Sequence, residues 1–229
     1  MKRKVIYINI FLTLILMSAL IVSCKKDHIE QPVDVGYEYY PVKVGNWTIF
    51  NVDSIVYNDF TGKVDTFDYQ IKEVIESDFT DNQGRKTQRL ERYRRLNDTC
   101  QWIIQDVWYS NLTSTTAEKV EENVRYVKLI FPVKSNQEWN GNTYNYLDPE
   151  TYTYSALYHP YDSINIHFDS TITVIHRDEL NLILNDYAIE IFAKNVGLIY
   201  KKDRHLEMQP DGTIIRGLDL TYKIHLFSQ

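Results

Sequence analysis

One segment of the chain is rich in basic residues, and their chemistry suggests anion binding. Its members are Arg85, Lys86, Arg89, Arg92, Arg94 and Arg95, with Glu91 as the single acid among them. Guanidinium groups hold phosphate or carboxylate oxygens through paired hydrogen bonds, so the segment is a candidate patch for a polyanion, such as an acidic glycan, or for an acidic partner strand. The alternative is a solvated strand whose arginines pair with acids on neighbouring strands and cover tyrosines with their aliphatic stems.

A second candidate surface is rich in tyrosine. Residues 140–161 mix Asn, Thr, Asp and Pro with tyrosines at Tyr144, Tyr146, Tyr152, Tyr154 and Tyr158. Tyrosine offers rigid contact area together with a hydroxyl group, and sugar rings stack on such side chains. We therefore predict an aromatic binding loop here, and the alternative is a pair of edge strands with ordinary half-buried tyrosines.

Motifs for catalysis or for metal binding are missing from the sequence. None of the six histidines forms an i, i+4 pair, and His167 with Asp169 would supply only two metal ligands. Serine-hydrolase elbows, phosphate-binding glycine loops and dinucleotide fingerprints are absent as well. We expect no catalytic residue, no metal site and no cofactor. A glycan hydrolase stays an alternative, because it needs only two suitably placed carboxylates among the 31 acids.

Cys24 is the residue with the clearest predicted chemistry. Lys2, Arg3 and Lys4 precede an apolar run at residues 5–22, which ends in Ile-Val-Ser-Cys at residues 21–24. This run resembles a bacterial lipoprotein signal, which implies that residues 1–23 are removed and that Cys24 becomes a lipidated N-terminus. The alternative is an uncleaved membrane span, but a short basic start and a small residue before the cut favour a signal peptide.

Residues 24–36 are expected to be the lipidated cysteine and a flexible tether, because they are polar and include Pro32. The charged residues after Cys24 resemble the surface-export signals of Bacteroidetes lipoproteins. We therefore expect an outer-membrane lipoprotein that faces the periplasm or the cell surface. Cys100 would then be left alone, so no disulfide framework is expected.

The charge balance narrows the class of partner. The chain carries 25 basic and 31 acidic residues, and loss of residues 1–23 leaves 22 basic residues and a net charge near −9. Phosphate backbones require a basic surface, so nucleic acid is not an expected partner. Membrane attachment should depend on the N-terminal acyl chains, since each buried methylene contributes about 0.8 kcal/mol.

Residues 37–229 are expected to form a single β-rich domain. Apolar residues alternate with polar ones over several segments, as at Tyr187, Ile189, Ile191 and Ala193, and at Ile164, Ile166, Phe168, Ile172 and Val174. This period of two is typical of antiparallel strands with one wet and one dry face. Turn signals at residues 58–62, 81–84, 140–142 and 209–212 separate such segments and predict consecutive hairpins.

A sheet with that many strands must curl or pair with another layer to bury its dry face. The predicted fold is therefore mainly β, as a curved antiparallel sheet or half-barrel with little helix, and the alternative is a two-layer β-sandwich. Residues 115–128 are the best candidate for a helix, because Thr116 could cap it and Glu118, Glu121 and Glu122 favour it. The other interpretation of that segment is a loop that leads into a strand.

Two segments carry a resemblance to a known group of proteins. Residues 39–50 contain Tyr-Tyr-Pro-Val-Lys-Val-Gly-Asn followed by an aromatic strand, and residues 193–200 read Ala-Lys-Asn-Val-Gly-Leu-Ile-Tyr. Both are similar to segments of small, uncharacterised Bacteroidetes lipoproteins, although Asn195 stands where their second pattern often has glycine. The resemblance implies an exported, lipidated domain and implies no activity.

The expected function is a lipid-anchored cell-envelope protein, not an enzyme, that acts as a binding or assembly module. A glycan, a lipid or another envelope protein is the expected ligand. One alternative is a lipid or lipoprotein carrier of the half-barrel type, which would need a deep, dry cavity. The other is the glycan hydrolase, which would need a polar cleft with perturbed carboxylates.

Overall fold

The computed structural model describes residues 34–228. Cys24, the expected signal at 1–23 and most of the expected tether lie outside these residues. The compact unit begins at Val35, whose carbonyl oxygen accepts a hydrogen bond from the N–H of Val133 at 3.1 Å. No helix among the described residues is long and apolar enough to cross a membrane.

Strands make up nearly all of the regular structure between residues 34 and 228, as the tyrosine-rich, alternating sequence predicts. A short 3-10 turn, η1 (Tyr37–Tyr39), precedes them. The twelve strands are β1 (Trp47–Tyr57), β2 (Val64–Thr80), β3 (Lys86–Arg95), β4 (Ile103–Leu112), β5 (Thr116–Glu121), β6 (Val124–Ile130), β7 (Glu138–Asn140), β8 (Thr151–Ser163), β9 (Ile166–Leu180), β10 (Leu184–Ala193), β11 (Gly197–Met208) and β12 (Ile214–Phe227).

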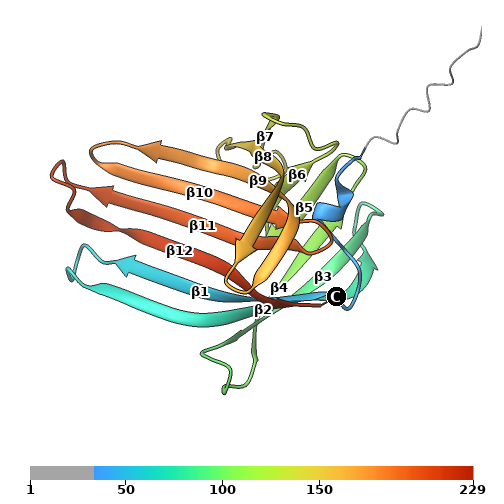
Figure 1. Ribbon diagram of the computed structural model, residues 1–229, viewed down its shortest axis with the longest axis horizontal. Helices are drawn as coiled ribbons and strands as arrows, with labels where there is room; N and C mark the ends of the chain where they lie inside the picture. The colour runs from blue at the N-terminus through green and yellow to red at the C-terminus, as the bar shows by residue number, and fades with distance from the viewer. Residues whose placement is uncertain (1–33, 229) are drawn as a thin grey trace, which may run out of the picture. The chain divides into compact units, whose positions relative to one another are not determined.

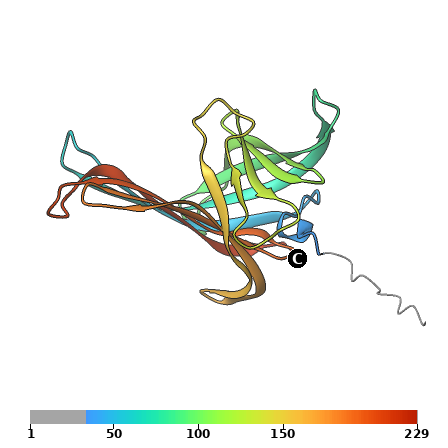
Figure 2. The ribbon, with the colours of Figure 1, turned by 90° about the horizontal axis from the view of Figure 1, so that it is seen from above.

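The strands form one antiparallel sheet in the order β6-β5-β4-β3-β2-β1-β12-β11-β10-β9-β8-β7. Every chain neighbour is therefore also a sheet neighbour, except at β6 and β7, while β1 pairs with β12 and joins the two halves of the chain. The long strands run together, and β3 to β6 curve away from them (Figures 1 and 2). This curvature brings the sheet close to closing into a barrel and confirms the prediction of a curved antiparallel sheet.

Side-chain and backbone hydrogen bonds link β6 to the β7–β8 hairpin. The indole N–H of Trp139 donates to the carbonyl oxygen of Val127 at 2.8 Å, and the N–H of Val127 donates to the carbonyl oxygen of Gly141 at 2.9 Å. The hydroxyl of Tyr154 accepts from the N–H of Ile130 at 3.0 Å and donates to its carbonyl oxygen at 2.8 Å. These contacts satisfy backbone groups that an open edge strand would expose.

Two apolar clusters fill the fold. The first gathers Tyr39 of η1 with residues of β5, β6, β8, β9 and β10, among them Leu129, Tyr154, Ile172 and Phe192. The second forms where Phe168 of β9 packs against β1, β2 and β10 to β12, through Phe50, Ile71, Ile199 and Ile224. The β8–β9 hairpin thus contributes to both clusters and supplies the second layer over part of the sheet.

The structure decides between the two interpretations of residues 115–128. The segment forms β5 and β6, joined by a two-residue turn in which Glu122 and Asn123 have φ of 49° and 64°. Two successive left-handed residues are typical of a type I′ hairpin turn, and the β-branched residues of β6 favour the strand. The helix interpretation is therefore wrong for this segment.

The predicted turns at residues 58–62, 81–84 and 209–212 fall between consecutive strands, as expected. The predicted turn at 140–142 begins at Asn140, the last residue of β7. Ile164 differs from the prediction, because it lies in the β8–β9 turn with φ of 40° and is exposed instead of sharing the buried face of Phe168. A tight turn there breaks the alternation that the sequence shows.

Candidate functional site

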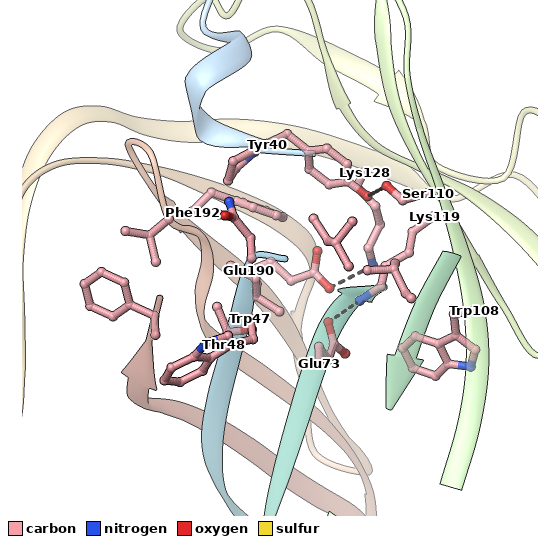
Figure 3. Close-up of a pocket in the computed structure, with 18 of the residues that line it drawn as sticks. Tyr40, Trp47, Thr48, Glu73, Trp108, Ser110, Lys119, Lys128, Glu190 and Phe192 are labelled. Atoms are coloured by element: carbon pink, nitrogen blue, oxygen red, sulfur yellow. Dashed lines mark hydrogen bonds and ion pairs between the residues drawn. The ribbon is translucent and has the colours of Figure 1, made fainter. Parts of the chain in front are cut away.

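A pocket of about 120 Å³ lies inside the curve of the sheet (Figure 3). Its lining residues come from β1 to β6 and from β10 to β12, so both halves of the chain build it. Aromatic side chains include Trp47, Trp108, Phe192, Tyr222 and Phe227, and seven lining side chains carry charge: Glu73, Arg92, Lys119, Glu121, Lys128, Glu190 and Lys201.

The two segments that carry the family resemblance meet at this pocket. Residues 40–41 and 46–48 line it, and so do residues 195–198 in the turn and start of the β10–β11 hairpin. The N–H of Asn195 donates to the carbonyl oxygen of Glu38 at 2.7 Å, and Lys194 Nζ lies 2.8 Å from Glu38 Oε1. Segments far apart in the sequence therefore share one wall.

Local backbone chemistry explains how this hairpin approaches so closely. Asn195 has φ of 64°, a left-handed conformation that asparagine tolerates and that glycine would adopt in the related pattern. Gly197 has φ of 90°, and a Cβ there would lie 3.4 Å from Cδ of Pro41. A side chain at residue 197 would thus be strained and would crowd the ring of Pro41.

A chain of alternating charges crosses the inner wall of the pocket. It begins with Lys128 Nζ, which lies 2.8 Å from Glu190 Oε1 and 3.7 Å from Glu121 Oε1. Lys119 Nζ continues it, at 4.0 Å from Glu121 Oε1 and 2.9 Å from Glu73 Oε2. The members alternate in sign, so each buried charge has an opposite neighbour, as buried ions require.

Arg92 extends this row of alternating charges across three neighbouring strands, β2, β3 and β4. Its cross-strand partners are Glu73 on β2 and Asp106 on β4, and its guanidinium lies 3.1 Å from each carboxylate. The guanidinium carbon also stacks over the ring of Trp108 at 3.6 Å, and Lys119 Nζ lies 4.8 Å from the same ring. This cation–π packing fixes Trp108 against the charged side of the pocket.

The pocket carboxylates are ionised at neutral pH. Burial pushes the pKa of Glu121 upward, but Lys128 and Lys119 outweigh it and lower the pKa from 4.5 to about 2. The pKa of Glu190 is also lowered, because Lys128 together with His176 and Lys201 outweighs its burial. The same balance, set by Lys119 and Arg92, lowers the pKa of Glu73. None of the three carboxylates therefore holds a proton that it could donate near pH 7.

His176 lies behind Glu190 and stays neutral. Its ring stacks on Tyr152 with centroids 3.8 Å apart, and its Nε2 lies 3.6 Å from Glu190 Oε2. Burial lowers the pKa of His176 from 6.5 to about 3, although Glu190 acts in the opposite direction. The desolvation cost of an imidazolium therefore exceeds the attraction of a carboxylate that is already paired with Lys128.

Lys201 is the least engaged cation of the pocket. It is the cross-strand partner of Glu190, yet its Nζ lies 3.9 Å from Glu190 Oε1, beyond hydrogen-bond distance. Among residues 34–228 its Nζ forms no hydrogen bond, and its side chain is 24% exposed. It thus presents donors that the protein itself does not use.

The basic cluster at residues 85–95 proves to be paired with acids for the most part. Arg85 lies near Asp81 and Glu118, Lys86 near Asp78, Arg89 near Glu76 and Glu91, Arg92 near Glu73 and Asp106, and Arg95 near Asp98. Arg94 instead lies over the ring of Tyr69 at 4.1 Å. Much of the positive charge is therefore neutralised locally, and polyanion binding stays a prediction without support from this geometry.

The predicted aromatic loop does not form one surface. Tyr152 and Tyr154 lie in β8 and are 3% and 0% exposed, whereas Tyr146 in the preceding loop is 83% exposed. Tyr144 and Tyr158 are also exposed. The prediction is wrong for Tyr152 and Tyr154, because the Tyr154 hydroxyl bonds to the backbone of Ile130 and the Tyr152 ring stacks on His176. Binding by the three exposed tyrosines stays a prediction.

The remaining candidates add no metal site. His167 lies 2.6 Å from Asp162 and 3.4 Å from Asp169, and all three side chains are exposed. No group of three or more His, Cys, Asp or Glu side chains between residues 34 and 228 is arranged to hold a metal ion. Cys100 is a free cysteine and is partly buried.

Sequence reasoning named Arg92 but missed the six other charged residues of the pocket, and Glu190 shows why. The alternation placed Ile189 and Ile191 on the dry face of β10 and so placed Glu190 in solvent, yet Glu190 is 1% exposed. Both faces of β10 are buried, one by the second apolar cluster and the other by the pocket. The only local signal for the buried position of Glu190 was a charged residue between apolar residues of β10.

Comparison with known proteins finds structural likeness only. No protein family and no curated protein matches it. Two solved structures resemble it: a Bacteroides fragilis NCTC 9343 protein assigned as exported, with a YmcC-like fold, and a Parabacteroides distasonis ATCC 8503 protein assigned as a lipoprotein. The first has 7% identity, a TM-score of 0.43 and coverage of 82% of this chain and 98% of its own. The second has 9% identity, a TM-score of 0.36 and coverage of 83% and 98%. Likenesses this distant carry no argument about function.

Proposed function

We propose that this chain is a lipid-anchored, non-catalytic binding module of the cell envelope, and that the pocket inside the curved sheet is its ligand site. The observation that carries the proposal is the meeting of residues 40–41 and 46–48 with residues 195–198 in the pocket lining. Buried ion pairs hold the inner wall in place before any ligand arrives. A preformed wall of this kind lowers the entropic cost of binding.

The size and polarity of the pocket favour a small ligand over a lipid cargo. Its volume of about 120 Å³ is below the roughly 300–1,000 Å³ typical of ligand cavities. Seven charged side chains line it, whereas an acyl chain requires a dry, apolar cavity. The half-barrel carrier is therefore the less supported alternative.

The electrostatics of the pocket also disfavour a glycan hydrolase. Such an enzyme needs one carboxylic acid whose pKa is raised, so that it can protonate the leaving oxygen. Ion pairs lower the pKa of Glu73, Glu121 and Glu190 instead. Binding without chemistry is thus the simpler use of this pocket.

The envelope location rests on the sequence. The predicted signal at residues 1–23 and lipidation of Cys24 would anchor the domain to the outer membrane, on its periplasmic or cell-surface side. Residues between Cys24 and Val35 would then act as the tether. A ligand of such a module would be a molecule of the envelope or of the surrounding medium.

A bulky substitution in the pocket lining tests the proposal. Val196 lines the pocket, so Val196→Phe should obstruct it, while Val64→Phe places the same change at an exposed position of β2 away from it. Native mass spectrometry of protein isolated from its own envelope should show a bound small molecule on the wild type and on Val64→Phe. That molecule should be lost from Val196→Phe. Equal occupancy of both variants, or no bound molecule on any of the three proteins, would contradict the proposal.

A further inference from the structure

We infer that the pocket ligand is a small anion with one ring-sized apolar part, and that Lys201 receives its carboxylate or phosphate group. The inference rests on the proposed function and specifies the ligand of the same site. Three properties of the pocket carry it: its volume, its two unlike sides and the distribution of its hydrogen-bond donors.

The volume sets the size of the apolar part. An engineered protein cavity of about 150 Å³ accommodates a benzene molecule. The present pocket has about 120 Å³ and is open at its mouth. It therefore takes one ring or a short branched chain, and the rest of a larger molecule would extend outward.

The two sides of the pocket call for an amphipathic ligand. Trp47 and Phe192 lie on one side of the view in Figure 3, and Lys119 and Trp108 lie on the other. Val196, Leu198 and Phe227 add apolar surface to the lining, while the remaining charged residues add polar surface. A ring would bury its faces against the apolar side, and a polar group would reach the charged side.

The distribution of donors selects an anion. Arg92, Lys119 and Lys128 each donate to a carboxylate at 2.8–3.1 Å, and Lys201 does not. A partly buried ammonium with unused donors gains from a charged acceptor, since the low dielectric strengthens the bond. An oxygen of the ligand would provide that acceptor beside Lys201 Nζ.

The pocket carboxylates offer less to a cationic ligand, because lysine or arginine side chains neighbour each of them. Glu190 Oε1 already accepts from Lys128, and Glu190 Oε2 is inaccessible and faces His176. Both oxygens of Glu73 are bonded, to Arg92 and to Lys119. Glu121 is the remaining pocket carboxylate, and it lies 3.7 Å from Lys128 Nζ and 4.0 Å from Lys119 Nζ. An ammonium beside Glu121 would therefore be repelled by these two lysines.

Four probes that differ only in their polar group test the inference: phenylacetate, phenyl phosphate, phenylacetamide and phenethylamine. Calorimetric titration of the mature chain should show that one or both anions bind at least tenfold more tightly than the neutral amide. The amine should bind most weakly. The preference between phenylacetate and phenyl phosphate then distinguishes the two sources of the anion.

Substitution of Lys201 locates the effect. Lys201→Met should lower the affinity for the preferred anion about tenfold and leave the amide unchanged, and Lys201→Arg should keep the preference for the anion. Lys202→Met is the matched control, because Lys202 is the next residue of β11 and pairs with Asp219 and Thr221. Circular dichroism would confirm that each variant is folded.

Several results would overturn the inference. They are equal binding of the amide, tighter binding of the amine, no binding of any probe, or an unchanged anion preference in Lys201→Met. The proposed function would survive them if Val196→Phe still removed the molecule bound in the envelope. The proposed function itself would fail if Val196→Phe kept the bound envelope molecule.

Discussion

Lys128 on β6 and Glu190 on β10 meet inside the curved sheet, with Lys128 Nζ 2.8 Å from Glu190 Oε1. Seven strands separate β6 from β10 in the hydrogen-bonded order, so the pair joins the two halves of the sheet across its interior. Their side chains are 7% and 1% exposed. The pair therefore links the closure of the fold to the inner wall of the pocket.

Removing the negative partner of this pair should destabilise the protein strongly. Glu190→Gln leaves Lys128 buried with a weaker partner, and loss of one member of a buried ion pair costs about 3–5 kcal/mol. Urea denaturation would measure the loss. The matched control is Asp53→Asn, because Asp53 and Lys223 form a half-exposed pair at 2.9 Å whose loss should cost below about 1 kcal/mol. Equal costs for the two variants would contradict the importance of the interior pair.

His176 should make the stability depend on pH. Its pKa is about 3 in the folded protein and 6.5 in the unfolded chain, so the unfolded chain binds more protons between these values. Stability should therefore fall as the pH falls from 6.5 towards 3, by up to about 2 kcal/mol at pH 5. Glu121 and Glu190 contribute only at lower pH, because their lowered pKa values make stability fall below about 4.5.

The variant His176→Phe would isolate this effect, since it keeps an aromatic ring on Tyr152. Its unfolding free energy should change much less between pH 7 and pH 5 than that of the wild type. His167→Asn is the control, because Asp162 raises the pKa of the exposed His167 and gives its contribution the opposite sign. An unchanged pH profile in His176→Phe would show that the buried ring is not neutral.

The hydroxyl of Tyr154 should be needed to close the sheet. Tyr154→Phe removes the bonds to both backbone groups of Ile130 and leaves these partly buried groups without that partner, which costs about 1–3 kcal/mol. Chemical denaturation would give the cost, and faster amide exchange at Ile130 would locate it. Tyr146→Phe should be neutral, because Tyr146 is largely exposed. Unchanged exchange at Ile130 would mean that other contacts close this edge.

Lipidation should depend on Cys24 alone. Cys24→Ser should move the protein from the membrane fraction to the soluble fraction without altering the unfolding of the domain. Cys100→Ser should stay with the membrane. If Cys24→Ser also stays there, the apolar run at residues 5–22 is a true membrane span.

The strands and turns of this protein are predictable because their signals are local. Alternation of apolar and polar side chains identifies most strands, and Asn, Asp and Gly mark the hairpins at residues 58–62 and 81–84. Where local signals conflict, as at residues 115–128, the glutamates favour helix and the valines favour strand. The left-handed turn at Glu122 and Asn123 and the pairing of β5 with β4 decide the outcome.

The amino-acid sequence by itself determined the sheet class, the hairpin order and the predicted lipidation site at Cys24. Only the tertiary structure decided which polar residues are interior. Alternation separates the two faces of a strand, but it does not show whether both faces are buried. By sequence alone, Glu190, Lys128 and Lys201 are expected to be surface charges. Pairing of β10 with β11 places Lys201 beside Glu190, and curvature of the sheet brings Lys128 to them. The curvature of the sheet depends on the twist and packing of many strands together. No single segment of the sequence therefore predicts the pocket.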